Sequence, residues 1–148
     1  MQSFAHTVKT WLLAQLMHPI LFLVGGAIWE GGDFSIGDAG FFLFFLLLAM
    51  LLSLPALIVS ALLLYGIVRW NQPGSHLFFF WILVTQLTLL INVACIFICV
   101  DREWPPAEAW LLASPAAVAA LSAVLIRRNA FYQLVSDYQI KNHEDNLV

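Results

Sequence analysis

The sequence contains few charged residues and no basic cluster. Only 10% of its 148 residues are charged, with six Lys plus Arg against nine Asp plus Glu and a net charge of −3. Soluble domains carry roughly a quarter of their residues as charges, and nucleic-acid-binding domains concentrate basic ones. Because 62% of the residues are hydrophobic and the mean hydropathy is +0.90, we expect an integral membrane protein that contacts the lipid bilayer and no nucleic acid.

Cysteine is almost absent, and its placement argues against redox or metal chemistry. The two cysteines, Cys95 and Cys99, lie four residues apart in one apolar run. In a helix their side chains leave successive turns on the same face, which is poor disulfide geometry, and hydrocarbon disfavours the reactive thiolate. No CxxC spacing occurs. We expect both to be small, buried packing residues.

Charged residues are also missing from the interior of every apolar run. This absence disfavours ion-coupled transport, which relies on such residues. The serines inside the apolar runs, Ser53, Ser60, Ser114 and Ser122, have no His or carboxylate nearby in sequence, so we predict no catalytic residues and no enzyme activity. His18 is the single histidine inside an apolar run, whereas a haem site in a bundle needs two axial ligands; we predict no cofactor. An acidic group that matches no calcium loop is interpreted as solvated surface without a metal: Glu30, Asp33, Asp38, Asp101, Glu103 and Glu108.

Four long apolar runs are present. They cover Trp11 to Trp29, Phe41 to Val68, Leu77 to Val100 and Ala107 to Ile126. Each meets the requirement of about 20 helical residues for crossing about 30 Å of hydrocarbon. No small-residue cleavage site follows the first run, so we expect it to be retained. The short connections make neighbours antiparallel, which predicts an all-α, up-down four-helix transmembrane bundle over residues 1–128.

The basic residues indicate the orientation in the membrane. Five of the six lie at the ends that would share one side, and only Arg102 lies on the other; the five are Lys9, Arg69, Arg127, Arg128 and Lys141. Short basic loops stay in the cytoplasm. We therefore expect a multi-pass protein of the cell (inner) membrane with both termini cytoplasmic. Trp11 and Trp70 at the inner boundary, and Trp29, Trp104 and Trp110 at the outer one, suit interfacial anchors.

The last twenty residues, 129–148, have a different pattern. Phe131, Leu134, Val135 and Tyr138 follow helical i, i+3, i+4, i+7 spacing. We expect a cytoplasmic amphipathic segment that continues the fourth run or turns along the membrane surface. His143 to Asp145 are interpreted as part of a solvated tail.

Small and polar residues recur at spacings of three and four within the runs. Such stripes let membrane helices approach closely and hydrogen-bond. The first run contributes His18, Phe22, Gly25 and Trp29, with Gln15 close to the same face. In the second run the predicted packing residues are Ser53 and Ala56. In the third they are Thr85 and Thr88, in line with Asn92 and the two cysteines. In the fourth they are Ala113, Ala116 and Ala120, flanked by Ala109 and Ala123.

Four polar side chains form a predicted intramembrane layer. At about 1.5 Å of rise per residue, Gln15, His18, Ser60 and Gln86 lie about 6 to 13 Å from the inner boundary. His18 either packs by hydrogen-bonding a hydroxyl, an amide or a carbonyl freed by Pro19, or it serves a proton relay or a quinone contact.

Gln86 stands apart from the stripe of its own helix. It points roughly 140° away from the centre of the Thr85, Thr88, Asn92 face. Either the third run touches helices on two sides, or Gln86 contacts a second subunit through a face that also holds Phe79 and Leu90.

Three function classes remain open. The first is a non-enzymatic protein acting by helix association, as an accessory subunit or a self-assembling permeability protein, with itself or another membrane protein as partner. The second is a channel or a small-molecule or proton transporter whose path is lined by Gln15, His18, Ser60, Gln86 and Asn92. The third is a membrane inhibitor of an inserted toxin, of the immunity type.

The predicted orientation is testable with single cysteines. A cysteine introduced at Ser35, in a background without the native cysteines, should react with an impermeant thiol reagent added to intact cells, because its loop faces outward. A cysteine at Ser75 should stay unlabelled until the cells are opened. The reverse pattern would overturn the orientation.

Overall fold

The chain folds entirely into helices over the residues that the computed structural model describes. They are α1 (Gln2–Glu30), α2 (Ile36–Ile67), α3 (Gly74–Val100), α4 (Ala107–Ile126) and α5 (Arg128–Asp145). The structure describes residues 2–30, 36–70, 72–100, 102 and 106–145, with side chains for all of these except 22, 23, 25–30, 36–43, 45, 100, 107–112 and 141–145. The all-α fold class is confirmed.

The helices extend beyond most of the predicted apolar runs. The fourth helix has the predicted bounds, but α1 begins at Gln2 instead of Trp11, α2 at Ile36 and α3 at Gly74. A run of apolar residues indicates which part of a helix could lie in hydrocarbon. The helix itself can be longer, because its backbone hydrogen bonds also form between polar residues. Polar residues such as Thr7 and Thr10 therefore continue α1 without a break.

Two stretches of the described helices are long and apolar enough to cross a membrane. They are Leu46–Ile67 in α2 and Gly74–Cys99 in α3, and Ala113–Ile126 in α4 is a shorter apolar helix. Much of the predicted first span lies outside the residues with described side chains, including Phe22, Gly25 and Trp29.

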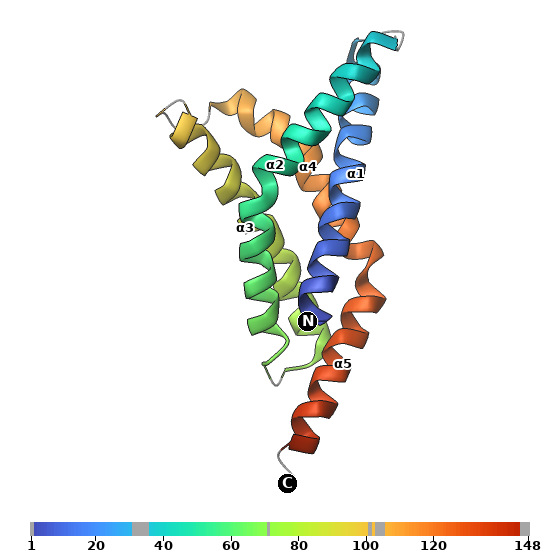
Figure 1. The fold of residues 1–148 in the computed structure, drawn as a ribbon, viewed down its shortest axis with the longest axis vertical. Coiled ribbons are helices and arrows are strands. Elements are labelled where there is room, and N and C mark those ends of the chain that lie inside the picture. The colour runs from blue at the N-terminus through green and yellow to red at the C-terminus, as the bar shows by residue number, and fades with distance from the viewer. Residues whose placement is uncertain (1, 31–35, 71, 101, 103–105, 146–148) are drawn as a thin grey trace.

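Helices α1 to α4 pack with antiparallel neighbours. Helix α1 contacts both α2 and α4, and α3 contacts the same two helices from the other side. Hydrogen bonds fix the pairing: Gln15 with Ser53, Asn92 with the Leu52 carbonyl, and Gln86 with the Ala117 carbonyl. The α1–α2 and α3–α4 hairpins diverge toward the end opposite α5 (Figure 1).

The apolar core lies at the other end, where α5 packs. The core residues come from α2, the start of α3, the end of α4 and α5: Leu64, Ile67, Val68, Leu77, Phe78, Trp81, Val124, Phe131, Leu134 and Val135. Helix α5 is offset from α4 at Arg127, whose backbone leaves the helical region. The predicted amphipathic face is therefore buried against the protein itself, and the predicted solvated positions 143–145 form the last turn of α5.

The predicted burial of the two cysteines is wrong. Both Cys95 and Cys99 are free and exposed. They lie near the end of α3, where this hairpin has moved away from α1 and α2 (Figure 1). The stripe of small and polar residues continues to the end of α3, but the neighbouring helices do not follow α3 that far.

One histidine is buried where α1 meets α5. The His6 side chain is 6% exposed, and its ring packs edge-on to Phe131 with 6.1 Å between centroids. Burial, assisted by the positive charges of Arg127 and Lys9, lowers the pKa of His6 from 6.5 to about 4. The folded protein therefore holds His6 neutral at pH values where the unfolded chain would protonate it.

The lowered pKa of His6 predicts that the folded protein loses stability as the pH falls. Above pH 6.5 the imidazole is neutral in both states and contributes nothing; between pH 6.5 and about 4 only the unfolded state binds the proton. The free energy of unfolding should thus fall by about 1.4 kcal/mol per pH unit in this window because of His6 alone. Unfolding in mixed detergent micelles measures it. His6→Gln should flatten the pH slope, whereas His76→Gln, at an exposed site, should leave it unchanged; equal slopes in all three proteins would contradict the assignment.

Candidate functional site

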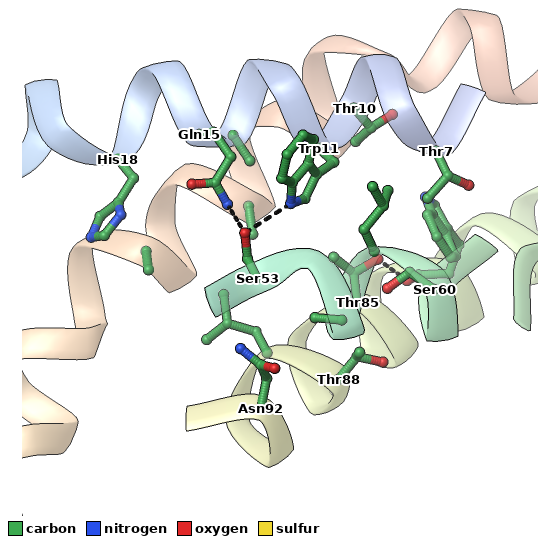
Figure 2. Close-up of a pocket in the computed structure, with 17 residues that line it drawn as sticks. Thr7, Thr10, Trp11, Gln15, His18, Ser53, Ser60, Thr85, Thr88 and Asn92 are labelled. Carbon is green, nitrogen blue, oxygen red and sulfur yellow. Dashed lines mark hydrogen bonds between the residues drawn. The ribbon is translucent and has the colours of Figure 1, made fainter. Parts of the chain in front are cut away.

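A polar cavity lies between the first four helices. It has a volume of about 110 Å³, is partly enclosed, and is lined by seventeen residues of α1, α2, α3 and α4, none of them charged. Figure 2 shows the ten lining residues with polar groups that it labels: Thr7, Thr10, Trp11, Gln15, His18, Ser53, Ser60, Thr85, Thr88 and Asn92.

The cavity follows from the same spacing that builds the stripes. On α1, Thr7, Trp11, Gln15 and His18 recur every three or four residues and so share one face. Helix α4 supplies mainly methyl groups, including those of Ala116 and Ala120. Because alanine leaves space that a larger side chain would fill, the side chains of the four helices do not fill the volume between them. The remaining volume is large enough for several water molecules.

Ser53 joins α1 to α2 at the wall of the cavity. Its hydroxyl oxygen accepts from Trp11 Nε1 at 3.0 Å and from Gln15 Nε2 at 2.8 Å, and it donates to the Met50 carbonyl at 3.1 Å. A hydroxyl has one hydrogen and two lone pairs, so Ser53 is fully engaged. The Gln15 oxygen consequently cannot take a hydrogen from Ser53.

Three of the four threonine hydroxyls of the wall donate to their own helices. Thr85 Oγ1 donates to the Trp81 carbonyl at 2.8 Å, Thr10 Oγ1 to the His6 carbonyl at 2.9 Å, and Thr7 Oγ1 to the Ser3 carbonyl at 3.0 Å. Their hydrogens are thus occupied, and only lone pairs remain available. Any group entering beside these threonines would have to act as a hydrogen-bond donor.

Asn92 binds the backbone of α2 close to a proline. Its Nδ2 donates to the Leu52 carbonyl at 3.2 Å. Pro55, three residues further on, has no N–H and leaves the Leu51 carbonyl without its usual intrahelical donor. Asn92 therefore closes the cavity against a part of α2 whose own hydrogen bonding is weakened.

Two buried polar atoms of the wall have no partner. Gln15 Oε1, an acceptor, and Trp81 Nε1, a donor, are buried and lack a hydrogen bond in the part of the chain that the structure describes. Figure 2 shows the Gln15 oxygen turned away from Ser53, on the side where His18 lies. Leaving a buried polar atom without a hydrogen bond lowers the free energy of unfolding by about 1 to 3 kcal/mol. Two such atoms in the wall of one cavity are therefore unusual.

The structure brings most of the predicted site residues together. Gln15, His18, Ser60 and Asn92 all line the cavity. The packing residues that join them there are Ser53, Ala56, Thr85, Thr88, Ala116 and Ala120. No hydrogen bond between described residues involves the His18 ring or the Ser60 hydroxyl. Ala113 is half-buried outside the cavity.

Gln86 lies elsewhere. Its Nε2 donates to the Ala117 carbonyl of α4 at 3.3 Å, on a different side of α3 from the cavity. The sequence left open whether Gln86 contacts another helix of its own chain or a second subunit. In the structure its amide contacts α4 of its own chain. Phe79 and Leu90 are exposed.

Sequence reasoning missed Trp81, Thr7 and Thr10. Trp81 precedes Thr85 by four residues and so begins the α3 stripe, but its size hides it from a search for small and polar residues. Thr7 and Thr10 continue the α1 face below Trp11, where the predicted span began. Extending the α1 stripe by one turn past the expected membrane boundary would have found Thr7 and Thr10, but not Trp81.

The predicted acidic surface group, Glu30, Asp33, Asp38, Asp101, Glu103 and Glu108, lies outside the side chains that the structure describes. Within the described part of the chain, no group of His, Cys, Asp or Glu side chains is placed to hold a metal ion. The chain matches no family model, no curated protein and no solved structure.

The hydrogen-bond network around Ser53 predicts a specific loss of stability. Ser53→Ala removes the acceptor of both Trp11 and Gln15, and we expect the free energy of unfolding to fall by about 1 to 2 kcal/mol. Ser60→Ala, on the same helix and in the same cavity but without a described hydrogen bond, should cost less than about 0.5 kcal/mol. Unfolding in mixed micelles compares them, and equal losses would show that the network contributes no stability.

Proposed function

We propose that the protein is a four-helix integral membrane protein with cytoplasmic termini, and that it binds and carries a small molecule in its intramembrane cavity. The fold supports the first part. The α2 and α3 stretches are long enough to span a bilayer. Lys9, Arg127 and Arg128 gather at the end that holds α5: the first two flank His6, and Arg128 lies 5.7 Å from the Phe78 ring. A common basic end suits one cytoplasmic side.

The cavity supports the second part, and it is the single observation on which the proposed function rests. In a bundle that works only by association, polar side chains would be expected to meet and leave no space. Here Gln15, His18, Ser60 and Asn92 come from three helices and surround an unfilled volume. Polar residues that face an internal space in a membrane protein are typical of a substrate path.

The cavity is closed toward α5, which favours a carrier over an open pore. Trp81, Thr7 and Thr10, at the α5 end, are buried, with Trp81 only 1% exposed and part of the apolar core. His18 and Asn92, toward the other end, are partly exposed. A solute would therefore reach the cavity from the end away from α5, and passage onward would require the core around Trp81 to open.

The association class has less support than the sequence alone indicates. Its main argument is an amide of Gln86 without a partner, and that amide is hydrogen-bonded within the chain. The exposed apolar side chains of α2 and α3 are accounted for by lipid. No specific feature of the described residues favours the toxin-inhibitor class.

Water accessibility of the cavity tests the proposed function. In a background of Cys95→Ser and Cys99→Ser, a cysteine at Ala116 would face the cavity, and one at Val118, 51% exposed on the same helix, would face lipid. Iodoacetamide is small and neutral. The cysteine thiolate attacks its CH2 carbon and displaces iodide, and hydrocarbon suppresses formation of that thiolate. In proteoliposomes we expect Ala116→Cys to react at least about tenfold faster than Val118→Cys.

Two results would count against the proposal. Equal and slow labelling of both cysteines would indicate a dry helix interface and favour association. Equal and fast labelling would indicate that α4 is generally exposed to water, which is incompatible with a transmembrane helix. Circular dichroism of each variant verifies that it is folded.

A further inference from the structure

The chemistry of the cavity wall restricts what can bind there. None of its lining residues carries an ammonium, a guanidinium or a carboxylate. Moving an ion out of water without a counter-charge is strongly unfavourable, whereas a neutral polar molecule needs only hydrogen bonds in exchange. The wall therefore discriminates against charged solutes and suits neutral ones.

The size of the cavity limits the part of a solute that it can enclose. Its volume is about 110 Å³, somewhat below the 150 Å³ of an engineered apolar cavity that holds benzene. A solute of about four to six non-hydrogen atoms would fill it. Lipid chains, peptides and aromatic cofactors such as quinones are too large for this space.

The wall also specifies which hydrogen bonds the solute must make. Gln15 Oε1 needs a donor, and Trp81 Nε1 needs an acceptor. The hydroxyls of Thr7, Thr10 and Thr85 already donate to their own helices and can only accept. His18 carries one nitrogen of each kind when neutral, and its ring has no described partner. At the His18 end of the cavity, an N–H or O–H group of the solute would donate to Gln15 Oε1, and its carbonyl or hydroxyl oxygen would accept from the protonated nitrogen of the neutral His18 ring.

We propose that the cavity is a binding site for a small neutral solute that carries both a hydrogen-bond donor and an acceptor, of the type of a short-chain amide. This ligand class rests on the proposed function, because a dry cavity would bind no solute. It goes beyond that function by excluding ions as the species held beside Gln15.

Competition with labelling tests the ligand class. Acetamide and acetate have nearly the same shape, but only acetamide is neutral and carries N–H donors. Ligands of about four non-hydrogen atoms bind weakly, so each is used at tens of millimolar. With iodoacetamide as reagent and Ala116→Cys as target, we expect acetamide to slow labelling about fivefold at four times its dissociation constant. Acetate at the same concentration should change the rate by less than about 1.5-fold.

Matched glutamine variants locate the effect. Gln15→Leu and Gln86→Leu each remove one half-buried amide with one described hydrogen bond, but only Gln15 lines the cavity. We expect protection by acetamide to be lost in Gln15→Leu and retained in Gln86→Leu. His18→Phe, which keeps an aromatic ring but removes the ring nitrogens on the side of Gln15 Oε1, should reduce protection and provides a second variant if Gln15→Leu does not fold.

The outcomes separate this inference from the proposed function. If Ala116→Cys is not labelled at all, the proposed function fails first. If it is labelled but acetamide and acetate protect equally, or neither protects, the cavity is wet but does not select neutral amides, and the ligand class is wrong. Loss of protection in Gln86→Leu as well would show that acetamide acts away from the cavity.

Discussion

The hydrogen bonds of Ser53 determine how α1 lies on α2. Two donors from successive turns of α1, Trp11 and Gln15, converge on one hydroxyl oxygen of α2. Two apolar helices can slide along each other at little cost, because leucine against leucine is much like leucine against lipid. Two hydrogen bonds from successive turns of α1 to one side chain of α2 hold a single register. With α1 fixed in this way, the polar face that holds His18 is turned toward α3 and α4, and the cavity results.

The molecule is organised around two different ways of filling the space between helices. Near α5 the space is filled by large apolar side chains, with Trp81, Phe131 and Leu64 fully buried. Further along, α4 presents alanines and the other helices present hydroxyls and amides, so the space stays open. Trp81 belongs to both regions, since it lines the cavity and is part of the apolar core. It is thus the side chain that separates the cavity from the α5 end.

Much of the site could be predicted from periodicity alone. Polar residues such as Gln15, His18 and Asn92 are costly in an apolar run, so their presence on one face of each helix indicates contact between helices. Trp81 could not be found in this way, because a tryptophan in an apolar run is ordinary and only its unpartnered indole N–H distinguishes it. Cys95 and Cys99 show the converse error. They fit the stripe by spacing, but nothing in the spacing reveals that α3 leaves its neighbours before it reaches them.

The sequence by itself determined the all-helical class, the approximate position of each long helix and the face on which its polar residues lie, because these depend on composition and on the 3.6-residue period of a single helix. Only the tertiary structure decided that Gln86 pairs with Ala117 of the same chain, that α5 packs onto the apolar core, and that the polar faces surround a cavity. These features depend on the distances and angles between helices. Such distances arise from many weak contacts between residues distant in sequence, and no local pattern encodes them.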